Sequence, residues 1–212
     1  MTRFAGLIEG YRHFREHEWR DERERWEKLA KGQSPEVMVI ACSDSRSEPA
    51  QIFNTHPGEI FVVRNVGALV PPFETNPGRH GVSAALEFAV QFLKVKEIVV
   101  MGHGMCGGCH AALHRTMEGT EPGQGGFIAD WIAMLDEASA EVRAGPHPID
   151  SPAAARAMEL AAVRVSLANL RTFPCVRTKE ERGQLKLRGA LFAINDGVLH
   201  TLDESTGEFS PA

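Results

Sequence analysis

The chain has 212 residues, of which 43% are hydrophobic and 24% are charged, and its formal net charge at pH 7 is −5. These values are ordinary for a globular protein that is long enough to form one well-packed domain. The acidic charge gives no reason to expect a nucleic-acid partner, because phosphate binding needs a basic face. No apolar run approaches the ~20 residues that a bilayer span needs, and charges begin at Arg3 where a signal peptide would be apolar. We therefore expect a cytoplasmic protein with no membrane partner.

Residues 1–34 predict a helical arm. Apolar side chains recur at helical spacing from Phe4 to Phe14, and Trp19 and Trp26 extend the pattern. This spacing predicts one or two helices that end near Gly32. The apolar faces of these helices need a partner, which is either the sheet of the same chain or another subunit.

Three short, continuous apolar runs predict strands that are buried on both faces. A segment with apolar residues at helical spacing lies between the second run and the third. The runs are Val37–Ala41, Ile60–Val63 and Ile98–Met101, and the helical segment is Val82–Leu93. Strand, helix and strand in succession predict a parallel sheet with right-handed crossovers.

The rest of the chain predicts further helices and a closing β-hairpin. The helices are Cys109–Met117, Phe127–Val142 and Ser151–Arg171, and the hairpin strands are Leu187–Ile194 and Val198–Leu202. The expected fold class is α/β, with a central, mostly parallel sheet of about four to five strands flanked by helices. We expect a single domain over residues 1–212, made of an arm at 1–34 and an α/β core at 35–212.

Two polar segments each follow a predicted buried strand. One is Cys42-Ser-Asp44-Ser-Arg46, and the other carries His103 and Cys106 among glycines. Ligands of open α/β sheets bind at the carboxyl ends of strands, so these side chains converge if their strands are neighbours. Two thiolates and one imidazole suit Zn²⁺, and three protein ligands leave a fourth position open, as in a catalytic site. The expected ligands of one zinc ion are therefore Cys42, His103 and Cys106.

The carboxylate of Asp44 is the candidate fourth ligand. Zn²⁺ with two thiolates is neutral, and a fourth ligand that is an anion makes the centre −1. Hydroxide and the carboxylate of Asp44 are both anions, so they compete for the one remaining position. Arg46 lies two residues further on and can hold a carboxylate through two hydrogen bonds. We expect Arg46 to draw Asp44 off the metal, so that bound water ionises with a pKa of ~7 and acts as the nucleophile.

Three rival interpretations use the same second segment. Gly102–Gly107 has the spacing of a dinucleotide-binding loop, but the region ~20 residues further on, Gly119–Gly126, has no strand pattern. Cys106–His110 matches a c-type haem attachment sequence, which is used outside the cytoplasm. Cys106 and Cys109 also have the spacing of a redox pair. In the zinc interpretation Cys109 is a small buried residue and not a ligand.

The chain resembles the β-class carbonic anhydrases over most of its length. The resemblance rests on the signatures Cys42–Arg46 and His103–Gly108, and on the stretches Lys31–Pro35 and Pro57–Val66. It implies a zinc-dependent lyase that hydrates carbon dioxide reversibly to bicarbonate and a proton through a zinc-bound hydroxide. The alternatives are a non-catalytic protein that binds zinc or bicarbonate and a redox protein with a CxxC pair.

The resemblance also implies residue roles and a homodimer or dimer-based oligomer, with the N-terminal helices wrapped on the partner subunit. It gives Cys42, His103 and Cys106 as ligands of one Zn²⁺ per chain, and Asp44 and Arg46 as the gating pair. For CO₂ and bicarbonate it implies contacts from Gln33, Phe61, Val66, Phe88 and Gly107. In these roles Gln33 reaches across the dimer interface, and Gly107 offers its backbone N–H. Phe88 stands where plant members carry a tyrosine, so the role of that position is open.

Overall fold

The computed structural model describes residues 2–212, and the chain divides between Ser34 and Pro35 into two compact units. The described part of the first unit contains three helices. They are α1 (Arg3–Glu16), α2 (Glu18–Asp21) and α3 (Arg23–Leu29).

The helices of the first unit differ in number and length from the sequence prediction. The sequence predicts one or two helices ending near Gly32, whereas the structure has three, and the last ends at Leu29. The breaks fall at His17, which has distorted right-handed dihedrals (φ −113°, ψ −79°), and at Glu22, where the backbone leaves the helical conformation (φ −100°, ψ 23°). None of the residues in these three helices is buried, and Phe4 is 69% exposed. Their apolar positions are therefore open to a partner.

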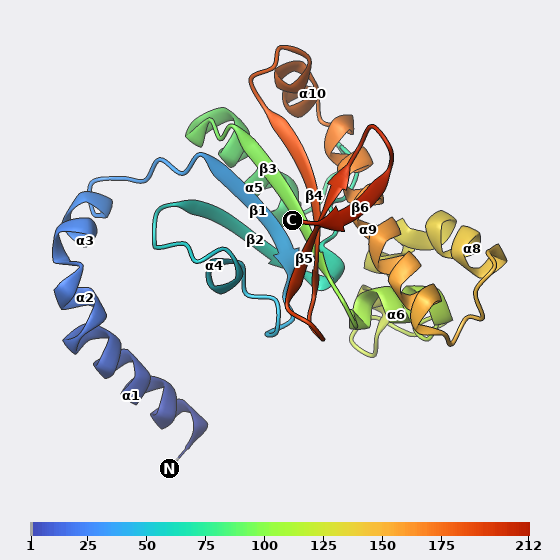
Figure 1. Ribbon diagram of the computed structural model, residues 1–212, viewed down its shortest axis with the longest axis horizontal. Coiled ribbons are helices and arrows are strands. Elements are labelled where there is room, and N and C mark those ends of the chain that lie inside the picture. Colours follow the sequence, from blue (N-terminus) through green and yellow to red (C-terminus); the bar gives the residue numbers. More distant parts are fainter. Residues whose placement is uncertain (1) are drawn as a thin grey trace. The chain divides into compact units, whose positions relative to one another are not determined.

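The second unit is built on a six-stranded sheet with the order β2-β1-β3-β4-β5-β6 (Figure 1). Its strands are β1 (Val37–Cys42), β2 (Ile60–Asn65), β3 (Glu97–His103), β4 (Lys186–Ala193), β5 (Val198–Asp203) and β6 (Glu208–Pro211). The first four pair in parallel, and β5 and β6 pair antiparallel. The predicted α/β class, with a mostly parallel sheet and a C-terminal hairpin, is confirmed. Strand β6 is an addition that the sequence pattern does not predict.

The helical segments of the second unit alternate with the first four strands. They are α4 (Pro49–Ile52), η1 (Val66–Ala68), α5 (Gly81–Glu87), η2 (Phe88–Leu93), α6 (Gly107–His114), α7 (Gly126–Ile132), η3 (Ala133–Leu135), α8 (Asp136–Ala144), α9 (Pro152–Thr172) and α10 (Pro174–Glu181). The single helix predicted over Phe127–Val142 is two helices joined by a 3₁₀ turn. The helix predicted over Val82–Leu93 ends in a π-helical segment.

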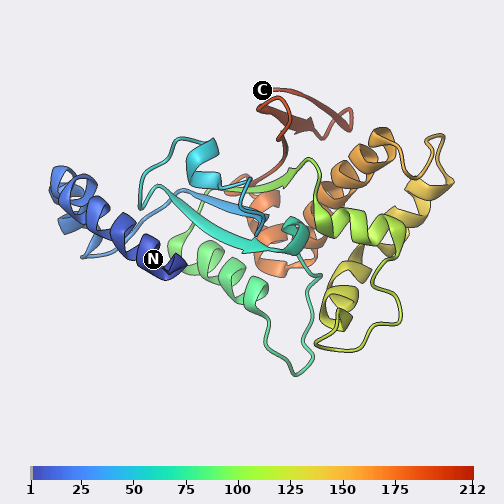
Figure 2. The same cartoon turned by 90° about the horizontal axis from the view of Figure 1, so that it is seen from below.

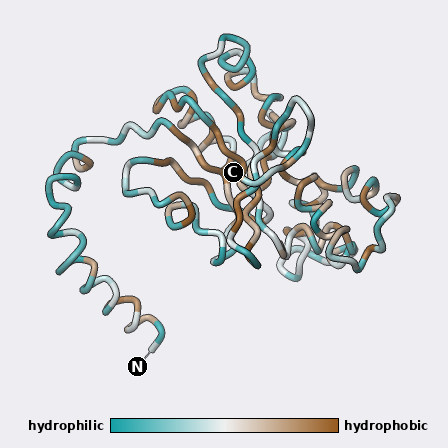
Figure 3. Tube along the Cα trace, in the orientation of Figure 1, coloured by the Kyte–Doolittle hydropathy of each residue, from teal (hydrophilic) through white to brown (hydrophobic). Residues whose placement is uncertain are grey.

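The apolar strands separate two cores, because successive side chains of a strand point to opposite faces. Met38 and Ile40 of β1 belong to the core formed with α5, η2 and α9. Val39 and Ala41 belong to the core on the other face, which Ile52 of α4 contacts. Figure 2 shows α4 and α5 on opposite sides of the sheet, and Figure 3 shows hydrophobic colour along the central strands. Burial on both faces explains why the strands are continuous apolar runs.

Candidate metal centre

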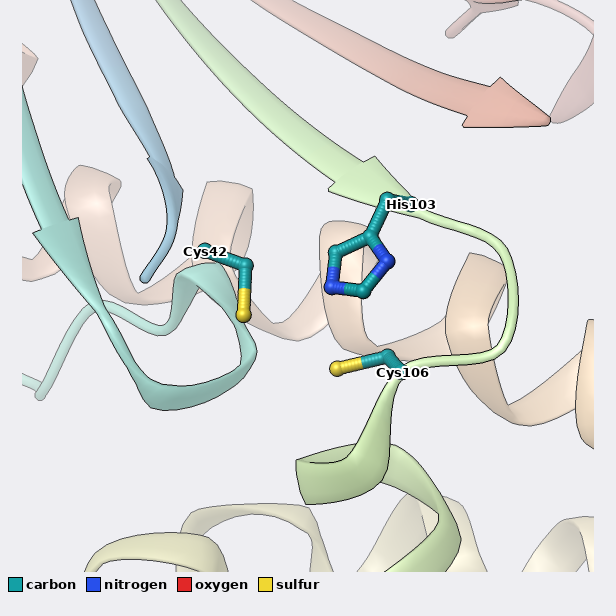
Figure 4. Close-up of side chains that lie close together, drawn as sticks. All are labelled: Cys42, His103 and Cys106. Carbon is teal, nitrogen blue, oxygen red and sulfur yellow. The ribbon is translucent and has the colours of Figure 1, made fainter. Parts of the chain in front are cut away.

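Three potential metal ligands meet at the carboxyl edge of the sheet. Cys42 is the last residue of β1 and His103 is the last residue of β3, and these two strands are parallel neighbours. Cys106 follows on the loop before α6 and precedes the first helical residue. The two Sγ atoms and one imidazole nitrogen lie within 4.8 Å of one another, and all three side chains are buried. Figure 4 shows the three side chains pointing toward a common point.

The imidazole of His103 has one nitrogen engaged and the other free to accept a bond. Its Nδ1 lies 2.8 Å from the carbonyl oxygen of Gly104. A carbonyl only accepts hydrogen bonds, so Nδ1 carries the proton and Nε2 presents its lone pair. Nε2 is buried and has no hydrogen-bond partner among the described residues. A buried acceptor without a donor is what a metal ligand looks like when the ion is removed, so the donor set fits Zn²⁺.

The two thiols are held in an environment that favours their neutral form. Hydrogen bonding with Cys106, followed by burial, raises the pKa of Cys42 to about 12. Hydrogen bonding with Cys109 and then burial raise the pKa of Cys106 to about 12. The main-chain N–H of Gly67 donates to Sγ of Cys42 at 3.4 Å. A divalent cation is therefore the group that would stabilise both thiolates in this pocket.

Asp44 does not belong to the convergent set, because Arg46 holds its carboxylate. Nε of Arg46 donates to Oδ1 at 2.9 Å, and Nη2 donates to Oδ2 at 2.7 Å. These hydrogen bonds hold the pKa of Asp44 well below its ordinary range. Oδ2 of Asp44 nevertheless lies 4.0 Å from Nε2 of His103. The carboxylate therefore sits at the edge of the ligand cluster without entering it.

Arg64 of β2 fixes the backbone that carries Cys42 and Asp44. Its Nε donates to the carbonyl oxygen of Cys42 at 2.8 Å, and its Nη2 donates to that of Asp44 at 2.6 Å. Its Nη1 forms an ion pair with Glu48. The segment after β1 is therefore anchored to the neighbouring strand by side-chain hydrogen bonds.

Glu159 of α9 contacts the loop that carries Cys106. Its side chain is buried, and Oε1 accepts a hydrogen bond from the N–H of Cys106 at 3.3 Å. Burial raises the pKa of Glu159, and hydrogen bonds from the main chain of Cys106 and Met105 oppose the shift. The loop that joins His103 to Cys106 is thus supported by a carboxyl group that lies more than fifty residues away in the sequence.

The substrate residues expected from the resemblance fall in different places. Val66 begins η1, directly before Gly67, and Gly107 begins α6, directly after Cys106. Both therefore adjoin the ligand cluster. Gln33 is exposed and belongs to the first unit.

Phe61 and Phe88 lie together, away from the ligands of their own chain. Their ring centroids are 5.9 Å apart, and Phe88 is 44% exposed. Asn65 is the β2 residue opposite Cys42, and Phe61 precedes it by four residues. At the rise of a strand, about 13 Å of β2 separates Phe61 from the level of Cys42.

Sequence reasoning misses two contributors to the site, Gly67 and Glu159. Gly67 has a φ of +79°, and its N–H reaches a ligand sulfur. A Val-Gly pair after a strand signals a turn but not a contact with a thiol. Glu159 is one acid within a long helix, and only the packing of α9 beside the ligand loop reveals its contact.

Comparisons with known proteins agree with this geometry. A family model described as carbonic anhydrase matches residues 37–199. A carbonic anhydrase of Pseudomonas aeruginosa is 36% identical over 203 residues, which are 96% of this chain and 89% of the relative. The solved structure of the β-carbonic anhydrase CcaA superposes with a TM-score of 0.90 at 29% sequence identity. The match covers 99% of this chain and 92% of the CcaA chain. A solved structure from work on two tetrameric β-carbonic anhydrases of Sordaria macrospora has a TM-score of 0.77 at 27% identity, covering 98% of each chain.

The chain belongs to the carbonic anhydrase family, in its β class. Its activity is the reversible hydration of carbon dioxide to bicarbonate. This assignment replaces the dinucleotide, haem and redox interpretations that the spacing of residues 102–110 leaves open. Within residues 2–212, no helix is both long enough and apolar enough to cross a membrane.

Proposed function

We propose that the chain performs carbon dioxide hydration with one Zn²⁺ held by Cys42, His103 and Cys106. The observation that carries this proposal is the Nε2 of His103, which is buried and has no hydrogen-bond partner within residues 2–212, on a side chain that meets two thiols. One ring nitrogen and the two sulfurs lie within 4.8 Å of one another. Such a donor set suits zinc and leaves one tetrahedral position for water. When bound there, zinc would supply a nucleophile near neutral pH by lowering the pKa of that water to ~7.

In this proposal Asp44 and Arg46 control the fourth position. Arg46 engages both oxygens of Asp44, so the carboxylate does not compete for the metal. Asp44 stays ionised because Arg46 lowers its pKa. An ionised carboxylate accepts hydrogen bonds only, so it can orient the O–H of water or bicarbonate beside the cluster. The pair thus acts as a gate and an orienting group together.

We propose that two copies of the chain complete each substrate pocket. Val66 and Gly107 would come from the chain that holds the metal, and Phe61, Phe88 and Gln33 from its partner. The ~13 Å of strand between Phe61 and the level of Cys42 supports this division. An exposed aromatic group, with Phe88 stacked on Phe92 at 5.6 Å, gives the second copy an apolar surface to cover. The tetrameric relatives from Sordaria macrospora are consistent with a dimer-based oligomer.

Two further expectations stay proposals. We propose that residues 1–34 and 35–212 act as one domain whose arm reaches the partner subunit, and the uncovered apolar positions of α1 support this. We also propose a cytoplasmic location, because a reducing compartment keeps both ligand thiols available for zinc.

The proposal is tested by the variant Cys42→Ser, with Cys175→Ser as its matched control. Cys175 is a free thiol outside the ligand cluster. Zinc content is measured by elemental analysis and hydration by stopped-flow with a pH indicator. We expect Cys42→Ser to lose zinc and hydration together, while Cys175→Ser keeps both. Full zinc content and full activity in Cys42→Ser would refute the proposed site.

A further inference from the structure

Glu159 is a buried carboxyl group for which the proposed reaction has no use. Its residue is 5% exposed, and its Oε1 accepts the N–H of Cys106 at 3.3 Å. A buried carboxyl group is costly unless it is well hydrogen-bonded. Its placement against the ligand loop therefore calls for a function that an apolar side chain could not provide.

The loop that Glu159 contacts is short and strained. Gly104 and Met105 alone separate the ligands His103 and Cys106, and Met105 has a φ of +56°. This left-handed conformation is unfavourable for a residue with a side chain, so the surroundings must hold it. The carbonyl oxygen of Met105 accepts a hydrogen bond from Nη2 of Arg46 at 3.1 Å. The loop is thus held by Arg46 at Met105 and by Glu159 at Cys106.

We propose that Glu159 is a positioning residue for the metal centre. Its carboxyl oxygen holds the main chain of the loop that carries the ligand Cys106. The same loop carries the carbonyl of Met105, to which Arg46 donates. This inference rests on the proposed zinc site. Removing the acceptor leaves a buried N–H of Cys106 unpaired, so the loop shifts to find another partner. Such a shift moves Sγ of Cys106 and the carbonyl of Met105 together. The effect would therefore reach both the metal and the Asp44–Arg46 pair.

Two variants separate positioning from folding. Glu159→Met keeps the length and volume of the side chain but removes both acceptor oxygens. A methionine fills nearly the same volume and leaves no cavity behind, so this variant is expected to fold. Glu159→Gln replaces the carboxyl group by an amide and keeps one acceptor oxygen for the N–H of Cys106. Ser139→Ala is the matched control, because Ser139 is also buried and donates to the carbonyl oxygen of Ala112 at 2.9 Å, away from the ligand loop.

The readouts are the rate of zinc loss to a chelator and the absorption spectrum of the cobalt-substituted protein. We expect Glu159→Met to lose zinc about 10- to 100-fold faster and to change the visible cobalt bands, as partners of metal ligands usually do. Glu159→Gln should stay within about threefold of the unaltered chain, because the acceptor is retained. Ser139→Ala should keep the unaltered zinc rate and cobalt spectrum.

Unaltered zinc loss and an unaltered cobalt spectrum in Glu159→Met would overturn the inference. Equal defects in Glu159→Met and Ser139→Ala would also overturn it, since they would show a general loss of packing. The proposed zinc site is judged separately by Cys42→Ser. If that variant keeps its zinc, the site itself is wrong. If it loses zinc while Glu159→Met behaves as the unaltered chain, only the role of Glu159 is wrong.

Discussion

Arg46 binds the carboxylate of Asp44 through three hydrogen bonds. Nε donates to Oδ1 at 2.9 Å, Nη2 donates to Oδ2 at 2.7 Å, and the main-chain N–H of Arg46 donates to Oδ1 at 2.9 Å. Both carboxylate oxygens are therefore directed toward one guanidinium group. The same Nη2 also reaches the carbonyl oxygen of Met105 at 3.1 Å, which lies between the ligands His103 and Cys106. One side chain thus links the gate to the loop that carries the metal.

Replacing Arg46 by alanine should inactivate the enzyme without removing its metal. Asp44 would lose both side-chain donors and, being only 4.0 Å from Nε2 of His103, could take the position meant for water. We expect hydration at pH 7.5 to fall by about 100-fold, the size typical of a misplaced reacting group. Zinc content should stay at the level of the unaltered chain. Stopped-flow hydration and elemental analysis on the same sample measure both quantities.

The control for Arg46→Ala is Arg188→Ala. Arg188 also forms an ion pair, with Glu97 at 3.2 Å, but on β4 away from the ligands. It should leave hydration unchanged. Normal hydration in Arg46→Ala would show that the guanidinium does not govern access to the fourth position.

Zinc binding should release about two protons, because both ligand thiols have a pKa of about 12 in the absence of metal. At pH 7 to 8 the metal-free thiols are neutral, and zinc must displace their protons to bind thiolates. Raising the pH lowers the proton concentration and so strengthens zinc binding, by about 100-fold per pH unit for two protons. Competition with a chelator of known affinity at several pH values measures this slope.

Two variants that each lack one cysteine show which thiols produce this pH dependence. Cys42→Ser should be isolated without zinc, but titration with added zinc should show weak binding with a dependence of about tenfold per pH unit, because one ligand thiol is left. Cys175→Ser removes a thiol outside the ligand cluster and should leave the full slope. An affinity that hardly changes with pH in the unaltered chain would mean that the thiols are not ligands.

Much of the architecture is predictable because burial on two faces leaves a clear mark on the sequence. The runs that contain Met38, Val63 and Val100 are apolar throughout, and each forms a strand of the sheet. The exceptions are elements whose stability comes from neighbours. Strand β6 is four residues long and mostly exposed, so no apolar pattern marks it in the sequence. It is defined by its pairing with β5. Helix α10 has a polar sequence after Pro174 and buries only Val176.

The ligands are predictable and their support is not. Cys42 and His103 each follow a strand, so the parallel sheet places them at one edge. The contact of Glu159 with Cys106 spans 53 positions, and the N–H of Gly67 reaches Cys42 across 25. No local spacing rule encodes such distances, because they depend on how α9 and η1 pack. The chemistry of a site is therefore easier to predict than the contacts that hold it in place.

Arg171 should contribute measurably to folding stability through two acids at once. It pairs with Glu180 of α10 at 2.7 Å and with Glu204, beyond β5, at 2.8 Å, each through two of its nitrogens. Its side chain is 36% exposed, so solvent screening reduces each pair to a fraction of its Coulomb energy. We expect Arg171→Met to lower the free energy of unfolding by about 1 kcal/mol.

Urea denaturation of Arg171→Met beside Arg188→Met checks this estimate. Among the described residues Arg188 forms an ion pair with one acid, Glu97, and its side chain is 53% exposed, so its replacement should cost at most about 0.5 kcal/mol. High salt should shrink the difference between the two variants, because screening weakens ion pairs. Equal midpoints for both variants at low salt would show that the second partner adds nothing.

Gly67→Ala should weaken zinc retention as well as folding, and Gly207→Ala separates the two effects. Gly67 has a φ of +79° and Gly207 a φ of +74°, so alanine is strained at both positions, by about 1 kcal/mol. A Cβ at Gly207 meets nothing within 4 Å, whereas one at Gly67 lies 3.2 Å from Cγ of Leu69. Only at Gly67 does the backbone also donate to a ligand sulfur, that of Cys42.

Backbone strain should therefore lower the free energy of unfolding of the metal-free chain by a similar amount in both glycine variants, as urea titration would measure. The value for Gly67→Ala should be somewhat lower than that for Gly207→Ala, because Leu69 must move. Zinc loss to a chelator should accelerate by about tenfold in Gly67→Ala alone, since a displaced N–H no longer stabilises the Cys42 thiolate. If Gly207→Ala lost zinc equally fast, general destabilisation would explain the result. Because the two positions differ in their contacts but hardly in φ, the difference in zinc loss measures what the Gly67 amide does for the metal centre.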